Sequence, residues 1–244
     1  MSSHEYYDQY WTEAGYQPRN HLFLKPIHDL YKEFLPAGST VVDVGCGDGR
    51  TSGPWLTENG YDYVGVDISA PAVRDASALG LKALVIDDAT SLPFQSNSID
   101  ACVCIEVLEH LFAPQLAVKE IVRLLRPGGI LIVTTPNVGY WKRRLELALL
   151  ARWNPLGDDL AIKEPWRDPH IRFFSLIALE RMLCSTGLEI TKIGGHEGSL
   201  LRDTPWIGRR LWRGRFSPLY GRAESALPSL LGHRLHAVCR KPDG

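Results

Sequence analysis

Apolar residues gather in short runs that alternate with amphipathic stretches along most of the chain. Five runs have the composition of buried strands: residues 40–44, 62–67, 82–86, 99–105 and 129–135. Helix-compatible stretches lie between them, at residues 50–60, 70–80 and 114–126. Strands separated by helices of this length favour right-handed crossover units, so the pattern predicts an α/β fold with a Rossmann-like, doubly wound, mostly parallel sheet.

The alternation stops after residue 135 and resumes later. Residues 136–174 do not fit it and are interpreted as an insertion over the carboxyl ends of the strands. A helix is predicted at 175–186, ended by Gly187, followed by a strand in "LEITKIGG". The apolar alternation at 234–240 is expected to complete the sheet.

Charge is distributed unevenly along the chain, although the formal net charge is only -1. Residues 141–152 carry four basic and one acidic side chain, and residues 202–241 carry nine basic and two acidic ones. These segments sum to +3 and +7, so the remainder is -11 by subtraction from -1. The basic charge therefore lies in the second half of the chain.

The five cysteines are odd in number and scattered, at positions 46, 102, 104, 184 and 239. They form no CxxC pair, which favours reduced thiols and argues against a zinc site. Cys102 and Cys104 alternate in an apolar run and are predicted to be buried small hydrophobes. The N-terminus lacks a signal-like apolar stretch, so a cytoplasmic location is expected.

A glycine-rich turn follows the first predicted strand in "VVDVGCGDGR", residues 41–50. Asp43 and Asp48 flank its glycines, and Arg50 stands where a dinucleotide-binding GxGxxG loop has its third glycine. Negative charge beside a pyrophosphate is unfavourable, so the turn argues against NAD. Asp67 ends the second strand, where a carboxylate can accept hydrogen bonds from two ribose hydroxyls.

Five segments follow one another along the chain: "VVDVGCGDG", "VGVDIS", "DDATSLPF", "IDACVCIEVLEHL" and "LLRPGGILIVTTPN". In order and spacing they resemble the class I S-adenosylmethionine-dependent methyltransferases, and in particular the ubiquinone-biosynthesis O-methyltransferases. The resemblance covers roughly residues 38–195. S-adenosylmethionine carries a sulfonium and an ammonium, and acidic groups near the turn attract both.

The resemblance implies where this cofactor binds. Asp43, Gly45 and Gly47 would line its amino-acid end. Asp67 would hold the ribose and Ile68 would pack on the adenine. Asp88 and Ala89, after the third strand, would define the adenine edge.

The sequence "EVLEH", residues 106–110, follows the fourth strand, where the transferred methyl would lie. A helical turn would place Glu106, Glu109 and His110 on one face, a set that suits Mg²⁺. In the ubiquinone-biosynthesis enzymes and the small-RNA 3′-end 2′-O-methyltransferases, a similar E-x-x-E-H is associated with a metal. By that resemblance His170, in "DPHIRFFS", would be a further ligand.

A reading without metal stays open for the same residues. We assign His110, His170 and Glu106 to catalysis, with Glu106 also in contact with the cofactor. Without metal, His170 is either the general base for an acceptor hydroxyl or an ordinary histidine near a helix start. The other histidines, at 4, 21, 28, 196, 233 and 236, lack a partner pattern and receive no role.

Two basic segments contain interleaved aromatic residues, "YWKRRLELALLARW" at 140–153 and "WIGRRLWRGRFSPLYGR" at 206–222. A solvated charged face is the favoured interpretation, followed by peripheral contact with a membrane or a lipid-linked acceptor. Single-stranded nucleic acid is the least favoured partner, because no RNA-binding module is recognised. Oligomeric state has no signature in the sequence.

These observations predict an enzyme that methylates a hydroxyl of a small molecule, with lipid-linked and sugar acceptors included. An RNA ribose 2′-O-methyltransferase and a non-catalytic S-adenosylmethionine-binding protein are the alternatives. The predicted domain organisation has four parts: an N-terminal helical cap at 1–37, the cofactor-binding core at 38–135, an acceptor-side insertion at 136–174, and the completion of the core with a basic C-terminal arm at 175–244.

Overall fold

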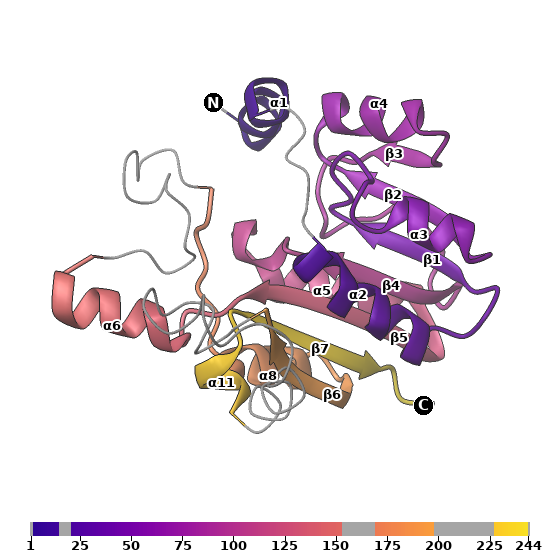
Figure 1. Ribbon diagram of the computed structural model, residues 1–244. Helices are drawn as coiled ribbons and strands as arrows, with labels where there is room; N and C mark the ends of the chain where they lie inside the picture. The colour runs from indigo at the N-terminus through magenta and orange to yellow at the C-terminus, as the bar shows by residue number, and fades with distance from the viewer. Residues whose placement is uncertain (1, 15–20, 153–168, 198–226, 244) are drawn as a thin grey trace.

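The fold is built on one seven-stranded sheet in the order β3-β2-β1-β4-β5-β7-β6 (Figure 1). A computed structural model describes residues 2–14, 21–152, 169–197 and 227–243. The strands are β1 Thr40–Val44, β2 Asp62–Asp67, β3 Ala83–Val85, β4 Ile99–Ile105, β5 Leu125–Pro136, β6 Glu189–His196 and β7 Arg234–Arg240. The first five strands pair in parallel, and β7 runs antiparallel between β5 and β6. The predicted Rossmann-like, mostly parallel sheet is confirmed.

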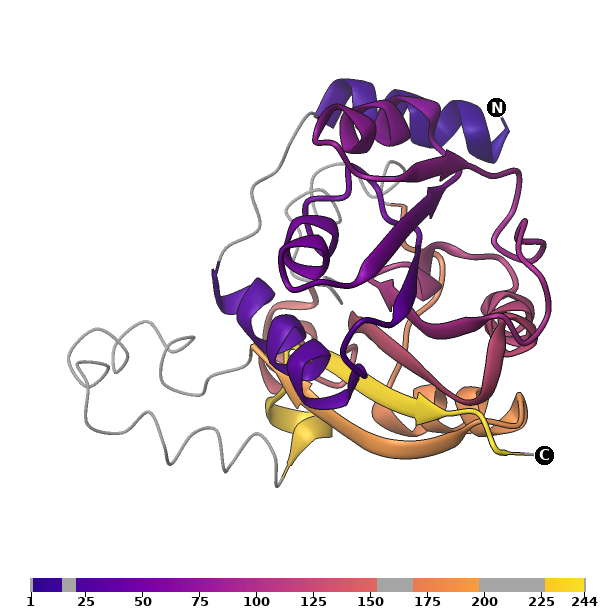
Figure 2. The same ribbon diagram turned by 90° about the vertical axis from the view of Figure 1, so that its right-hand side faces the viewer.

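Helices cover both faces of the sheet (Figure 2). Their bounds are α1 Ser3–Ala14, α2 His21–Phe34, α3 Gly53–Glu58, α4 Ala70–Ala78, η1 Leu108–His110, α5 Pro114–Leu124, α6 Trp141–Leu150, α8 Leu176–Ser185 and α11 Pro228–Leu231. One apolar cluster packs α2, α3 and α4 on the sheet, with Ile27 and Leu56 fully buried. The other packs α5 and α8 on the opposite face, with Ile121 and Leu179 fully buried. Each such side chain stabilises the fold by about 1.5–3 kcal/mol.

The fifth strand begins earlier than the sequence pattern predicts. The pattern predicts a helix over 114–126 and a strand from 129, with a turn in "RPGG" between them, but α5 ends at Leu124 and β5 already includes residues 126–129. The register shifts between Ile99 and Ala101, so a β-bulge accommodates the extra residues. Gly128 adopts a φ of 75°, and its N–H donates to the carbonyl of Lys241 at 2.9 Å. Because residues 126–129 pair with the C-terminal segment, they form a strand where a turn is predicted.

The remaining predicted elements lie where the hydrophobic pattern put them, within a few residues. Gly187 follows α8 with a φ of 87°, a conformation that ends a helix. Cys102 and Cys104 are buried on β4, as predicted. The described cysteines are all free thiols.

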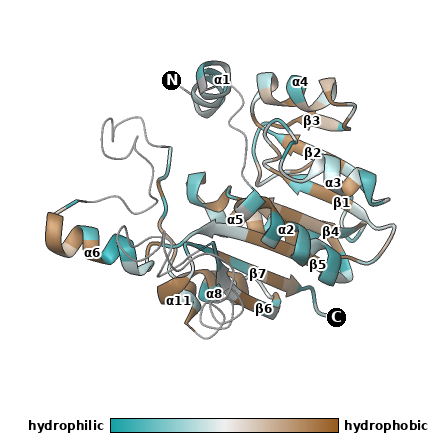
Figure 3. Ribbon diagram, viewed as in Figure 1, coloured by the Kyte–Doolittle hydropathy of each residue, from teal (hydrophilic) through white to brown (hydrophobic). Residues whose placement is uncertain are grey.

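Two helices lie at the periphery. The first, α1, packs along α4 at the end of the sheet that carries β3 (Figures 1 and 2). The other, α6, projects away from the sheet and has no buried residue, and its outer end is apolar (Figure 3). Within the described ranges, no helix combines the length and apolar character needed to cross a bilayer.

Candidate functional site

The glycine-rich turn between β1 and α3 is held against the end of β2. The N–H groups of Gly45 and Cys46 both donate to the carbonyl of Val66, at 2.8 and 3.0 Å. Gly45 and Gly47 have φ values of 76° and 55°, which favour glycine. A Cβ at Gly45 would lie 2.4 Å from the side chain of Val107. The bare glycine therefore permits close packing between the turn and the segment after β4.

Asp67, at the tip of β2, is buried against this turn. One carboxylate oxygen accepts from the N–H of Gly47 at 2.8 Å, and the other accepts from the N–H of Ser69 at 2.9 Å. Burial raises the pKa of Asp67, and these two bonds partly oppose that effect. A carboxylate offers about four acceptor positions, so two hydrogen bonds leave capacity for hydroxyl donors such as those of a ribose.

The resemblance predicts that Asp43 lines the cofactor, but its side chain lies deeper, beneath the glycine-rich turn. Its side chain is buried, and it accepts a hydrogen bond from the Tyr63 hydroxyl at 3.1 Å. Burial raises the pKa of Asp43 to about 7, although bonds to Tyr63 and Ser52 act in the opposite direction. Its contacts are those of a buried polar anchor under the turn, and a direct role toward the cofactor stays a prediction.

The segment after β3 passes beside Asp67. The N–H of Ile86 donates to the carbonyl of Asp67 at 2.9 Å. Asp88 is exposed, and one of its oxygens accepts from the N–H of Thr90 at 2.7 Å. Ala89, which follows Asp88, and Ile68, which follows Asp67, are both half-buried. The predicted adenine residues thus follow the strand ends that flank Asp67.

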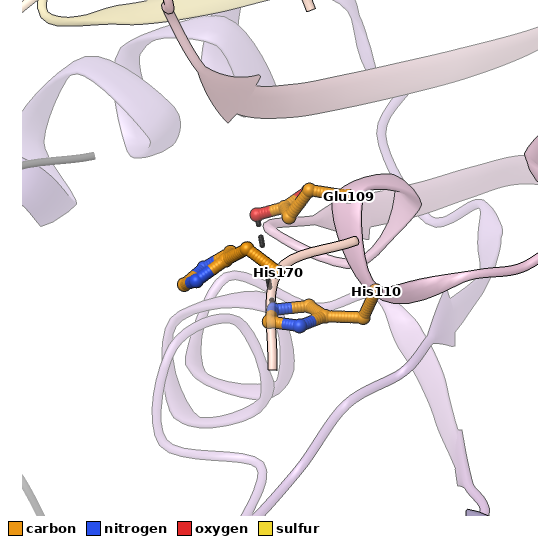
Figure 4. A group of neighbouring side chains, drawn as sticks. All are labelled: Glu109, His110 and His170. Carbon is orange, nitrogen blue, oxygen red and sulfur yellow. Dashed lines mark ion pairs between the residues drawn. The ribbon is translucent and has the colours of Figure 1, made fainter. Parts of the chain in front are cut away.

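Glu109, His110 and His170 converge at the end of β4 (Figure 4). One potential ligand atom from each lies within 4.8 Å of the other two. The carbonyl of Glu109 accepts from the N–H groups of Ile171 and Arg172, at 3.0 and 2.9 Å. These bonds fasten the segment that carries His170, so residues distant in sequence form one site.

The Glu109 carboxyl group is buried, and its two oxygens differ in their contacts. The side chain is 1% exposed, and one oxygen accepts from the Thr135 hydroxyl at 3.1 Å. The other oxygen, Oε1, is buried without a hydrogen-bond partner, with His110 Nε2 3.9 Å away. Burial, then the Glu106 carboxylate, raise the pKa of Glu109 well above its usual range. A cation bound here would stabilise the ionised form.

His110 is oriented by the same segment. Its Nδ1 lies 3.2 Å from the carbonyl oxygen of Pro169. Because a carbonyl only accepts, this bond requires the proton on Nδ1, which leaves the lone pair of a neutral imidazole on Nε2. Metal-ligating histidines commonly donate their second nitrogen to a carbonyl in this way. The donor set of one carboxylate and two imidazoles therefore fits a divalent cation.

The structure does not bring Glu106 into this group, and the predicted helical face is wrong. Only η1, a single 3-10 turn, forms here, and Glu106 has a φ of 58°. One oxygen of Glu106 accepts from the Thr134 hydroxyl at 2.9 Å, and the other pairs with Arg234. The exit from β4 through a left-handed residue thus turns Glu106 toward β5 and β7.

Arg234 is a member of this site that the sequence did not reveal. It is largely buried, pairs with both Glu106 and Glu197, and stacks 4.8 Å from the ring centroid of Phe23. Glu197 has a φ of 63°, so both acidic partners hold uncommon backbone conformations. Burial raises the pKa of Glu197, but the hydrogen bond from His233 and then the charge of Arg234 lower it to about 2.

The N-terminal helix contributes residues that also had no predicted role. His4 Nδ1 lies 3.1 Å from the carbonyl of Ile68, and the ring of Tyr7 meets that of His110 edge-on at 6.2 Å. Farther away, buried His196 and His236 lie with their Nδ1 atoms 3.1 Å apart. Both histidines lie on strands, where their spacing and surroundings are those of ordinary core residues, so no sequence signal marks the pair. The basic segment 206–222 lies outside the described residues.

Comparison with known proteins gives this site its context. Residues 42–133 match the family model described as "Methyltransferase domain". A 2-methyl-6-phytyl-1,4-hydroquinone methyltransferase from Synechocystis is 27% identical, over 87% of this chain and 73% of that protein. A ubiquinone biosynthesis O-methyltransferase from Cupriavidus pinatubonensis is 29% identical, over 70% of this chain and 72% of that protein. These matches identify a methyltransferase domain, and the chain is an S-adenosylmethionine-dependent methyltransferase.

Two further similarities of this methyltransferase say less about its function. A tRNA (carboxymethyluridine(34)-5-O)-methyltransferase from Arabidopsis thaliana is 33% identical over 64% of this chain, but the match spans only 39% of that protein. A crystal structure titled as an S-adenosylmethionine-dependent methyltransferase, possible histamine N-methyltransferase, from Thermotoga maritima superposes with a TM-score of 0.64 at 20% identity. It covers 98% of this chain and 99% of its own, and at that identity it supports the fold alone.

These matches confirm the resemblance to S-adenosylmethionine-dependent methyltransferases that the five sequence segments carry. The protein is a methyltransferase enzyme, so the alternative of a non-catalytic binding protein is set aside. The carboxyl ends of β1, β2 and β4 bring Asp67 and the Glu109 group to one edge of the sheet. This is the edge at which ligands bind in open α/β sheets.

Proposed function

We propose that this enzyme transfers the methyl group of S-adenosylmethionine to a hydroxyl oxygen of a small molecule. Asp67 would accept hydrogen bonds from the ribose, Gly45 and Gly47 would line the amino-acid end, and Asp88 with Ala89 would border the adenine. Ile68 would pack on the adenine, and Asp43 would support the turn from below. The positions of these residues at the ends of β1, β2 and β3 support this arrangement.

The observation that carries the proposal is the buried, unpartnered oxygen of Glu109 beside His110 and His170. Methyl transfer to a hydroxyl requires alignment of the oxygen with the methyl group and removal of one proton. The three side chains present a proton acceptor and two imidazoles at the strand end next to the cofactor residues. The relatives named for O-methylation agree with an oxygen acceptor.

Glu109, His110 and His170 would hold a divalent cation in this proposal, while Glu106 would act on the cofactor side. A cation there would polarise the acceptor hydroxyl and favour the loss of its proton. Mg²⁺ was the ion expected from four ligands including Glu106. With Glu106 paired to Arg234, two imidazoles and one carboxylate suit a transition-metal ion better than Mg²⁺, and Mn²⁺ serves as the probe ion.

A methyl-transfer assay with labelled S-adenosylmethionine tests the proposal. The acceptor panel should contain hydroquinones, catechols and sugar hydroxyls, because two relatives are named for quinone-type substrates. Label should move to a hydroxyl oxygen, and chelation should stop transfer while calorimetric binding of S-adenosylhomocysteine continues. Transfer to carbon or nitrogen alone would contradict the oxygen assignment. Transfer unaffected by chelator would leave His110 and His170 as metal-free acid–base residues.

RNA remains the second candidate acceptor, because one relative is named as a tRNA methyltransferase. Such an enzyme must bind RNA tightly, and binding must weaken steeply as salt rises. Filter binding with total tRNA at low and physiological salt distinguishes the two classes. Salt-sensitive binding together with methylated tRNA would replace the small-molecule proposal.

A peripheral membrane contact through α6 would suit a lipid-linked acceptor. Leu145 and Leu149, one turn apart, are 45% and 75% exposed, and Arg144 is exposed beside them. An exposed helix with apolar and basic side chains is typical of proteins that lie in the interface of anionic membranes. The proposed division of the chain into parts keeps four segments. Residues 1–37 would form the cap, 38–135 the cofactor core, 136–174 the acceptor-side insertion, and 175–244 the completion of the core.

A further inference from the structure

The inner face of α1 is built from polar and aromatic residues that contact the proposed cofactor site. His4, Tyr7, Asp8 and Trp11 are spaced i, i+3, i+4 and i+7, so they share one side of the helix. None of the described residues of α1 is buried, and none belongs to either apolar cluster. The helix is therefore held in place by specific contacts, not by burial in the core.

Two of these contacts fix α1 to the segment that follows Asp67. His4 Nδ1 lies 3.1 Å from the carbonyl oxygen of Ile68. The N–H of Ala70, the first residue of α4, donates to Asp8 at 3.0 Å. A carboxylate at the N-terminus of a helix satisfies a free N–H and interacts favourably with the helix dipole. The polar side of α1 thus recognises the end of β2 and the start of α4.

Trp11 lies on the glycine turn. A Cβ placed on Gly47 would be 2.4 Å from the Trp11 ring, so the ring packs directly against the backbone of this glycine. The N–H of Gly47 is the group that donates to Asp67. The indole therefore covers the turn at the point where the turn meets the acidic residue of β2.

Tyr7 lies between the two halves of the site. Its ring is perpendicular to that of His110, with centroids 6.2 Å apart. Partial burial raises the pKa of Tyr7, and the neighbouring phenol of Tyr6 and the carboxylates of Asp67 and Glu109 raise it further, so Tyr7 is a neutral phenol. Because His4 and Asp8, on the same side of α1, contact Ile68 and Ala70 just after Asp67, Tyr7 lies between that end of the site and His110.

We propose that α1 forms a wall of the S-adenosylmethionine site and that the aromatic rings of Tyr7 and Trp11 recognise the sulfonium. This inference rests on the proposed function, in which Asp67 holds the ribose and the Glu109 group receives the acceptor. The sulfonium joins the ribose to the amino-acid end, so it must lie between those groups, next to Tyr7. Aromatic rings attract cations through the negative charge of their faces. The neutral thioether of S-adenosylhomocysteine gains nothing from that attraction.

Calorimetry with S-adenosylmethionine and S-adenosylhomocysteine tests this inference without an acceptor. Tyr7→Leu and Trp11→Leu should each weaken binding of the charged ligand about 3- to 30-fold more than binding of the neutral one. Tyr7→Phe keeps a ring and should keep the wild-type preference. Gln9→Leu is the control and should leave both affinities unchanged, because Gln9 lies on the same helix, is exposed and donates to Glu13 on the solvent side.

The outcomes separate this inference from the function on which it rests. Equal losses for both ligands in Tyr7→Leu and Trp11→Leu, or no loss in either variant, would overturn the sulfonium assignment. Asp67→Asn should weaken both ligands alike. If the wild-type protein binds neither ligand, the proposed function itself fails. If both bind and depend on Asp67 but not on the rings, only the role of α1 fails.

Discussion

His170 lies beside His110, with ring centroids 4.5 Å apart, although a long stretch of chain separates the two histidines. The contact depends on backbone bonds from Ile171 and Arg172 to the carbonyl of Glu109. Because these bonds use main-chain atoms, the segment can hold His170 in place whatever its other side chains are. The relationship brings a residue from the predicted insertion to the end of β4, where the acceptor is proposed to bind.

The first prediction concerns Asp67. Asp67→Ala should weaken binding of S-adenosylhomocysteine by about 1.5–3 kcal/mol, because a charged acceptor of hydrogen bonds is lost. Asp62→Ala is the control, since Asp62 lies on the same strand in an exposed pair with Lys82. Calorimetry of the three proteins checks the effect. Equal dissociation constants would remove Asp67 from the cofactor site.

A second prediction concerns Arg234, which neutralises two largely buried carboxylates. Arg234→Met should lower the free energy of unfolding by about 3–5 kcal/mol, because the largely buried carboxylates of Glu106 and Glu197 lose the positive charge that they share. Arg126→Met removes a more exposed pair with Asp100 and should cost about 0–1 kcal/mol. Urea denaturation measures both. Similar losses in the two variants would show that the buried ion pairs of Arg234 contribute no more to stability than the exposed pair of Arg126.

The buried carboxyl group of Asp43 gives a third prediction, about pH. Its pKa is raised to about 7 in the folded protein, so the native state binds more protons than the unfolded chain between about pH 4 and pH 7. Asp43 therefore contributes stability that is fully present below pH 4 and is lost as the pH rises through 7. Asp43→Asn removes this dependence and can still accept from Tyr63.

Denaturation at a series of pH values should show the Asn variant gaining stability relative to the wild type as the pH rises from 4 to 7. The difference between the two proteins is the quantity to follow, because other groups also titrate in this window. His196 and His236, whose pKa values burial lowers to about 3 and 4, act in the opposite direction in both proteins. Parallel curves would mean that Asp43 titrates normally.

A fourth prediction concerns the exposed helix α6. The double variant Leu145→Ser, Leu149→Ser should reduce co-sedimentation with vesicles of equal parts anionic and zwitterionic phospholipid, because two insertable side chains are lost. Arg144→Glu should act similarly, since a basic residue near such a surface contributes about 1 kcal/mol. Leu116→Ser, on the body of the protein and 46% exposed, is the control. Absence of sedimentation by the wild-type protein would return α6 to an ordinary solvated helix.

The sheet could be predicted from the sequence because local pattern determines it. Each parallel strand contains a short, mostly apolar run, and glycine or proline marks most of the boundaries. The one displaced boundary, at the start of β5, depends on pairing with Lys241 far along the chain. Hydrophobic periodicity is a local pattern and does not reveal pairing with a distant segment.

The candidate site was predictable where a motif lies at a strand end, and not where distant elements meet. Asp67 and the Glu109–His110 pair follow apolar runs directly, so their shared edge is implied by the fold. Glu106 was misplaced because spacing i, i+3, i+4 was read as helix, whereas the chain leaves β4 through a left-handed residue. Tyr7 and Arg234 were missed because only tertiary packing brings α1 and β7 to the site.

Metal binding by the purified, metal-stripped protein tests the proposed acceptor site most directly. Titration with Mn²⁺ should show binding that His170→Ala and Glu109→Gln each weaken at least about tenfold. Glu106→Gln should leave it largely intact, and so should His28→Ala, which removes an imidazole stacked on Trp55 elsewhere. We expect this pattern because Glu109, His110 and His170 would supply the ligand atoms. Equal Mn²⁺ affinity in the wild-type and His170→Ala proteins, or no binding at all, would contradict it.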